Sequence, residues 1–71
     1  MSKHQLRFQI NGESREVTDP MTVRALIESH KLSPEKVAVE LNRRLLRSDK
    51  YDTTLLKEND EIEIVTFVGG G

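Results

Sequence analysis

Apolar and polar residues alternate near the start of the chain, and an Asn-Gly pair follows them directly. Residues 6–10, in which leucine, phenylalanine and isoleucine are separated by single polar residues, have the period of a strand with one buried face. Asn11-Gly12 is the strongest short-range hairpin signal, because the favoured two-residue turns need positive φ at such positions. The return strand then covers residues 13–17. The chain is therefore expected to begin with a β-hairpin that lies on a core.

A single helix is expected after this hairpin. Thr22 can accept a hydrogen bond from the backbone as an N-cap residue. Val23, Leu26 and Ile27 then recur on one face of a helix, and His30 continues the same spacing. Together these residues predict a helix from Val23 to about His30.

The second half of the chain predicts three further strands. Two of them flank a turn at Asn42-Arg43, and the last one follows a turn at residues 57–60. Strands that pack together on one helix form an α+β domain. Here we expect a mixed sheet of about four to five strands packed on one main helix. The strands are expected at residues 37–41, 44–47 and 61–68, with a helical turn at residues 48–51.

Composition limits the function classes open to this chain of 71 residues, which has the size of one small domain. Eleven basic and twelve acidic residues leave a net charge of −1, so there is no bulk attraction to nucleic acid or to an anionic membrane. Cysteine is absent, and His4 and His30 lack the spacing of a metal site, so no bound metal or cofactor is expected. The apolar runs are too short to span a membrane and no signal peptide is evident, which predicts a cytoplasmic location.

Three of the four glycines are the last three residues, Gly69, Gly70 and Gly71. Glycine lacks a Cβ atom, so a run of glycines is thin enough to enter a narrow channel in another protein. Fully extended, this run reaches about 10 Å beyond Val68. We therefore expect the glycine run to present the α-carboxylate of Gly71 as the reactive group. The rest of the chain would serve to hold and present this group.

The last predicted strand has apolar side chains on both of its faces. Ile62 and Ile64 share one face, and Val65 and Phe67 lie on the other. If the isoleucines face the helix, Val65 and Phe67 point outward just before the glycines, where they would suit a docking surface. The alternative is that strand twist or a bulge covers them within the domain.

Two charged clusters each admit a structural and a functional interpretation. A basic cluster lies within residues 43–47, and an acidic stretch lies within residues 58–63. Such charges commonly keep a turn or a strand face solvated. They can also dock or steer a protein partner of opposite charge. RNA binding is disfavoured, because the few aromatic residues form no stacking platform.

Several segments together resemble one known family. They are the strand that ends in Asn11-Gly12, the helix from Val23, residues 37–42, residues 55–64 and the ending Phe67-Val68-Gly69-Gly70-Gly71. This combination spans nearly the whole chain and resembles the ubiquitin-like β-grasp sulfur carriers, most closely the ThiS family of thiamine biosynthesis. The resemblance implies a β-grasp domain over residues 1–68 and a flexible glycine tail over residues 69–71.

Two positions depart from the family pattern. Arg43 stands where the family often has glycine, and Glu58-Asn59-Asp60 stands where it often has Asp-Gly-Asp. Asparagine is the next-best residue for a left-handed backbone, so the second change is expected to preserve its turn. The first change either alters the turn or changes its type.

The resemblance also implies a chemistry and a set of partners. A separate ThiF-like enzyme would use ATP to adenylate the carboxylate of Gly71, and a donor such as a cysteine desulfurase would supply the sulfur of a thiocarboxylate. A ThiG-like thiazole synthase would receive that sulfur. The chain would thus be a carrier and not an enzyme. Gly69, Gly70 and Val68, with Val65 and Phe67, would meet the partners.

Three other functions remain open at this point. The small subunit of molybdopterin synthase uses the same thiocarboxylate on a different acceptor. A ubiquitin-like modifier would end in an isopeptide bond to lysine. A β-grasp interaction domain without a reactive end would leave the glycines without a role.

Overall fold

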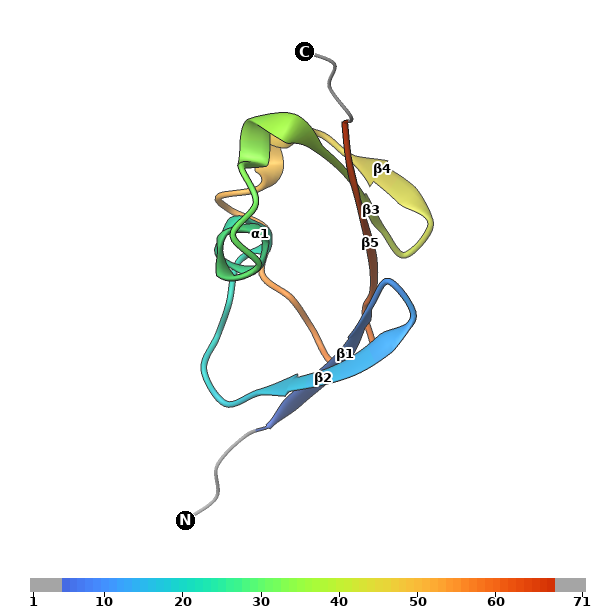
Figure 1. Ribbon diagram of the computed structural model, residues 1–71. Coiled ribbons are helices and arrows are strands. Elements are labelled where there is room, and N and C mark those ends of the chain that lie inside the picture. Colours follow the sequence, from blue (N-terminus) through green and yellow to red (C-terminus); the bar gives the residue numbers. More distant parts are fainter. Residues whose placement is uncertain (1–4, 68–71) are drawn as a thin grey trace.

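The computed structural model describes residues 5–67, which form one mixed sheet and one α-helix (Figure 1). The sheet has five strands in the order β2-β1-β5-β3-β4. The strands are β1 (Leu6–Ile10), β2 (Glu13–Val17), β3 (Val37–Leu41), β4 (Arg44–Leu46) and β5 (Glu61–Thr66), the helix is α1 (Val23–Ser29), and two 3-10 turns are η1 (Pro34–Lys36) and η2 (Ser48–Lys50).

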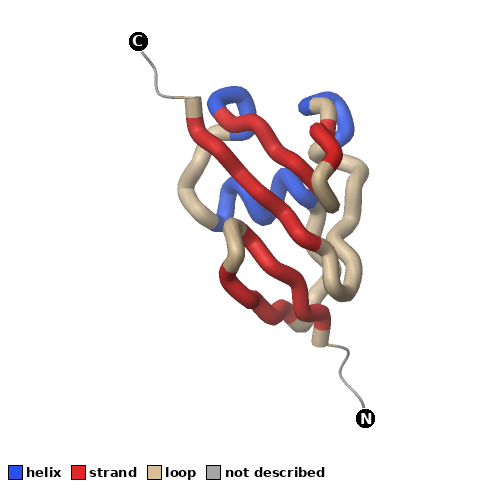
Figure 2. The backbone as a smooth tube through the Cα atoms, turned by 90° about the vertical axis from the view of Figure 1, so that its right-hand side faces the viewer, coloured by secondary structure: helices blue, strands red, loops and turns tan. Residues whose placement is uncertain are grey.

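In this topology one face of the sheet packs against the helix. β1 and β5 are parallel neighbours at the centre, and β1–β2, β3–β4 and β3–β5 are antiparallel pairs. Figure 2 shows the sheet face on, with α1 crossing behind it. The expected α+β architecture, with a mixed sheet on one main helix, is confirmed.

The core lies between α1 and the inner face of the sheet. Val23, Leu26 and Ile27 of α1 are almost fully buried, as the spacing predicted. The Thr22 side chain caps the helix by accepting a hydrogen bond from the Ala25 amide at 3.1 Å. The strands and the loop after β4 supply the rest of the core: Phe8, Ile10, Val37, Val39, Tyr51, Leu56, Ile62 and Ile64.

Several element ends differ from those predicted. α1 ends at Ser29, and His30 is its C-cap. β4 ends at Leu46, because Arg47 already forms the entry to η2. β5 ends at Thr66 and not at Val68, since Phe67 lies beyond the strand and Val68 lies outside the described residues.

Both hairpin turns have two residues with positive φ, as type I′ turns require. The first turn has Asn11 at φ 51° and Gly12 at 84°, and the second has Asn42 at 54° and Arg43 at 70°. The turn expected at Asn42-Arg43 therefore keeps its form although arginine occupies the second position. The cost is steric, because a left-handed backbone brings the Cβ atom of arginine close to its own carbonyl.

Replacing Arg43 by glycine is expected to stabilise the protein. Relief of the left-handed backbone should raise the free energy of unfolding by about 0.5–1 kcal/mol, after allowance for the greater freedom of glycine in the unfolded chain. The Arg43–Glu61 ion pair is long, at 3.8 Å, and highly exposed, so its loss should matter little. Urea denaturation measures the change.

Gly12→Ala is the matched control for this substitution. A Cβ atom at Gly12 would meet nothing within 4 Å, so the variant should lose stability through its backbone conformation alone. An Arg43→Gly variant no more stable than the unsubstituted protein would contradict the assignment of strain to Arg43.

Candidate functional site

β5 leads into the glycine run and is the central strand of the sheet. It pairs with β3 from Val37↔Thr66 to Leu41↔Ile62. The amide of Phe67 donates to the carbonyl of Lys36 at 2.9 Å, which extends this ladder beyond the strand. The backbone is thus held as far as Phe67, the last described residue.

The side chain of Asn11 holds β5 from the opposite edge. Backbone pairing between β1 and β5 ends at Ile10↔Ile62, because the chain turns away into the hairpin. The side-chain amide of Asn11 then takes the place of the next backbone pair. Its Oδ1 accepts from the backbone amide of Ile64 at 2.9 Å, and its Nδ2 donates to the backbone carbonyl of Ile64 at 3.3 Å. The second half of β5 is therefore hydrogen-bonded along both edges.

Asn42 plays a related part at the start of β5. Its backbone amide donates to the carbonyl of Glu61 at 2.7 Å, and its Oδ1 accepts from the amide of Glu61 at 2.9 Å. Its Nδ2 donates to Oδ1 of Asp60 at 2.9 Å, while Oδ2 of Asp60 accepts from the amide of Lys57 at 2.7 Å. Each hairpin turn thus contributes one asparagine that fixes the strand before the glycine run.

The acidic residues within 58–63 differ in burial and in their hydrogen bonds. Asp60 is only 8% exposed and serves its own turn, so it is not part of a steering surface. Glu58 accepts a hydrogen bond from the amide of Arg7 at 3.0 Å. Glu61 and Glu63 are exposed, on the face of β5 opposite to the buried isoleucines.

Val65 and Phe67 are each 60% exposed, so the expectation that they point outward is confirmed. The alternative, in which the domain covers both side chains, is wrong. Val65 lies opposite Ala38 of β3, on the face turned away from α1. Leu45 of β4 is 72% exposed and lies on the same face. We call Ala38, Leu45, Val65 and Phe67 the apolar patch.

Leu45 was not among the predicted site residues. The signal was available, because a two-residue turn at Asn42-Arg43 places Leu45 opposite Glu40 in the hairpin. Glu40 alternates with buried residues of β3 and therefore faces outward. Combining the turn type with this alternation would have placed Leu45 beside the outward residues of β5.

A groove of about 580 Å³ lies beside the apolar patch, along the part of β3 that β4 does not cover. Tyr51 is buried and is one of the residues that line the groove, and its hydroxyl donates to the carbonyl of Val37 at 3.4 Å. Burial raises the pKa of the Tyr51 hydroxyl, so it is a neutral donor. The groove is lined by Arg24, Pro34, Glu35, Val37, Ala38, Leu45, Leu46, Arg47, Ser48, Tyr51 and Phe67.

The predicted site residues Val68, Gly69, Gly70 and Gly71 lie outside the described residues. The structure shows the surface that precedes them in the chain: the hydrogen-bonded end of β5, the apolar patch and the groove. Within residues 5–67, no helix is long and apolar enough to cross a membrane. In the same part of the chain, no three acidic or histidine side chains gather as a metal site would require.

Comparison with known proteins assigns this arrangement to a family. The sequence matches the ThiS family over residues 8–71, which includes all three terminal glycines. This chain belongs to the ThiS family. Its fold is the ubiquitin-like β-grasp fold of ThiS: the structure superposes on the crystal structure of the thiamine biosynthesis protein ThiS from Geobacter metallireducens with a TM-score of 0.76 and 32% identity, covering 93% of this chain and 100% of that one.

Two relatives extend the comparison. The chain is 38% identical over 65 residues to the sulfur carrier protein ThiS of Bacillus subtilis, covering 90% of this chain and 98% of that protein. It is 36% identical over 66 residues to the thiazole synthase of Magnetococcus marinus. That match covers 93% of this ThiS-family chain but only 20% of the synthase, so it concerns one region of a much longer protein.

Proposed function

We propose that this ThiS-family protein is the sulfur carrier for formation of the thiazole ring in thiamine biosynthesis. The observation that carries the proposal is the family match, which extends through Gly71 and thus includes the group that would hold the sulfur. The likeness to the sulfur carrier protein of B. subtilis supports it over nearly the full length of both chains.

The proposed chemistry takes place at the carboxylate of Gly71. A carboxylate is a poor acyl donor, because oxide would have to leave. A ThiF-like partner would transfer AMP from ATP to this carboxylate, with loss of pyrophosphate, and AMP is a good leaving group. The outer sulfur of a persulfide, supplied by a donor such as a cysteine desulfurase, would then attack the carbonyl carbon, displace AMP and form an acyl disulfide. A thiol would cleave the S–S bond of this acyl disulfide, which releases the thiocarboxylate and leaves a disulfide on the donor. The resulting thiocarboxylate is the nucleophile that delivers sulfur to the forming ring.

In this proposal the folded domain holds and presents its own end, and catalysis belongs to the partners. The asparagine contacts fix β5, and the apolar patch, with Val65 and Phe67, docks the partner while Gly69 and Gly70 enter its channel. A ThiG-like thiazole synthase is the proposed acceptor. The similarity of this chain to a region of a thiazole synthase supports that pairing.

The same similarity favours the thiamine branch over molybdopterin synthase, whose small subunit would use identical chemistry on another acceptor. A ubiquitin-like modifier is a different outcome of the same activation. It would give covalent conjugates that persist on a denaturing gel, whereas a carrier would not. A binding domain without a reactive end would keep its function after removal of Gly70 and Gly71.

The test is the intact mass of the protein before and after incubation with ATP, a ThiF-like enzyme and a sulfur source. We expect the mass to rise by the difference between one sulfur and one oxygen atom, and fragmentation should place the change at Gly71. The control is the chain without Gly70 and Gly71, which should show no change. An unchanged mass of the full chain, with the enzyme active on another carrier, would refute the proposal.

A further inference from the structure

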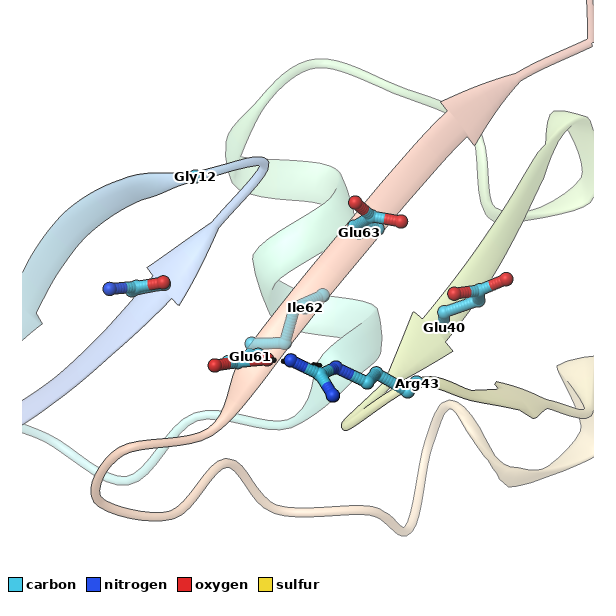
Figure 3. Close-up of a pocket in the computed structure, with 7 residues that line it drawn as sticks. Gly12, Glu40, Arg43, Glu61, Ile62 and Glu63 are labelled. Carbon is cyan, nitrogen blue, oxygen red and sulfur yellow. Dashed lines mark ion pairs between the residues drawn. The ribbon is translucent and has the colours of Figure 1, made fainter.

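The face of the sheet opposite α1 carries carboxylates next to the apolar patch. Glu40 of β3 and Glu63 of β5 are register partners, so their side chains leave the sheet side by side. Figure 3 shows both on the near side of the strands, with α1 behind them, and Glu61 on the same strand as Glu63. These carboxylates border a cleft of about 260 Å³ lined by Gln9, Gly12, Glu40, Arg43, Glu61, Ile62 and Glu63.

Glu40 and Glu63 carry like charges at directly opposite positions of an antiparallel strand pair. Residues directly opposite in an antiparallel pair have Cβ atoms about 5 Å apart, and like charges there repel. Arg43, which lines the same cleft, reaches Glu61 at 3.8 Å. Within residues 5–67, neither Glu40 nor Glu63 takes part in an ion pair. Ion pairs within the described part of the chain therefore do not explain why two glutamates stand opposite each other here.

The carboxylates and the apolar patch form one continuous surface. Val65 follows Glu63 by two residues on the same face of β5, a separation of about 7 Å. Leu45 lies opposite Glu40, so the exposed leucine borders the pair from the other side. We call Glu40, Glu61 and Glu63, together with the apolar patch, the mixed face.

We infer that the mixed face docks a basic protein surface. An arginine or lysine of the partner lies between Glu40 and Glu63, and apolar side chains of the partner pack against Leu45 and Val65. The inference rests on the proposed function, since the partner is the adenylating enzyme that receives Gly71. Charge complementarity decides the class of occupant. Two carboxylates that form no ion pair within residues 5–67, beside exposed aliphatic groups, match a cation set among apolar residues. A partner guanidinium would relieve the repulsion by bridging both carboxylates.

The experiment compares binding of a purified ThiF-like enzyme, without ATP, to the full chain and to the double variant Glu40→Gln with Glu63→Gln. Loss of both charges should raise the dissociation constant about 10-fold at low salt. The difference should shrink in 1 M salt, where the Debye length is about 3 Å. The thermal midpoint of the variant should equal or exceed that of the unsubstituted protein, because repulsion has been removed.

The matched control also removes two acidic charges, through Glu13→Gln with Asp19→Asn. Glu13 and Asp19 are exposed and lie off the mixed face, so this variant should bind like the unsubstituted protein. Val65→Ser should weaken binding with little dependence on salt, since it alters the apolar part of the same face.

Three results would overturn the inference. If the Glu40/Glu63 variant binds the enzyme as tightly as the unsubstituted protein, the docking inference fails and the carrier function stands. If the unsubstituted protein neither binds the enzyme nor gains sulfur, the proposed function fails as well. A self-associated protein that the double substitution makes monomeric would assign the mixed face to a second copy of the chain.

Discussion

A Gly70→Val variant of this ThiS-family protein is expected to remain folded but no longer to be adenylated by the partner enzyme. Within residues 5–67 the buried core residues lie between Phe8 and Ile64, so we expect this core to form whether residue 70 is glycine or valine. Valine adds a branched side chain where the proposed partner channel accepts only backbone. A reacting group displaced by about 1 Å can lose about 100-fold in rate, and we expect at least that loss here.

The rate is measured as ATP-dependent formation of the acyl-adenylate with a ThiF-like enzyme, and folding is checked by thermal unfolding. Gly70→Ala is the graded control, because a methyl group should reduce the rate less than an isopropyl group does. Gly69→Val tests whether the requirement extends further from the carboxylate. Normal activation of Gly70→Val would disprove the idea that the glycine run threads a narrow channel.

The second large effect is expected from Asn11→Ala, which should lower the free energy of unfolding by about 3 kcal/mol. Two contributions add. The substitution removes both side-chain hydrogen bonds to Ile64, and it places alanine at a φ of 51°, where a Cβ atom is strained. Because a folded domain is stable by about 5–15 kcal/mol, the loss is a large part of the total.

Asn59→Ala separates the two contributions to this loss. Asn59 also has a positive φ, of 68°, but its side chain is exposed and makes no hydrogen bond within the described residues. Its replacement should therefore cost only the conformational part, about 1 kcal/mol. Chemical denaturation gives both values, and equal losses in the two variants would show that the Asn11 side chain does not hold β5.

Local patterns predicted the elements of this fold well, because each was encoded within a few residues. The alternation before Asn11-Gly12 and the spacing of Val23, Leu26 and Ile27 identified a hairpin and a helix without any knowledge of the sheet. Element ends were less accurate, since Arg47 could extend a strand or begin a turn. Only the contacts of the folded chain decide between these possibilities.

The contacts that define the site were beyond a local pattern. Asn11 and Ile64 are 53 positions apart, and nothing near Asn11 indicates that its amide completes a ladder with β5. The acidic stretch near the last strand was visible in the sequence, but Asp60 and Glu63 have opposite surroundings that only the fold reveals. Glu40 joined the mixed face because β3 and β5 pair in one particular register. The chemistry proposed for Gly71 came from family resemblance, since a carboxylate alone specifies no reaction.

The central position of β5 also has a mechanical consequence. A pull on the carboxyl end acts along a strand whose hydrogen bonds to β3 on one side, and to β1 and Asn11 on the other, are loaded in shear and share the force. An edge strand would instead peel away one bond at a time. An enzyme that draws the carboxyl end inward therefore pulls on a strand that is hydrogen-bonded on both sides, and the carrier can be released intact for the next encounter.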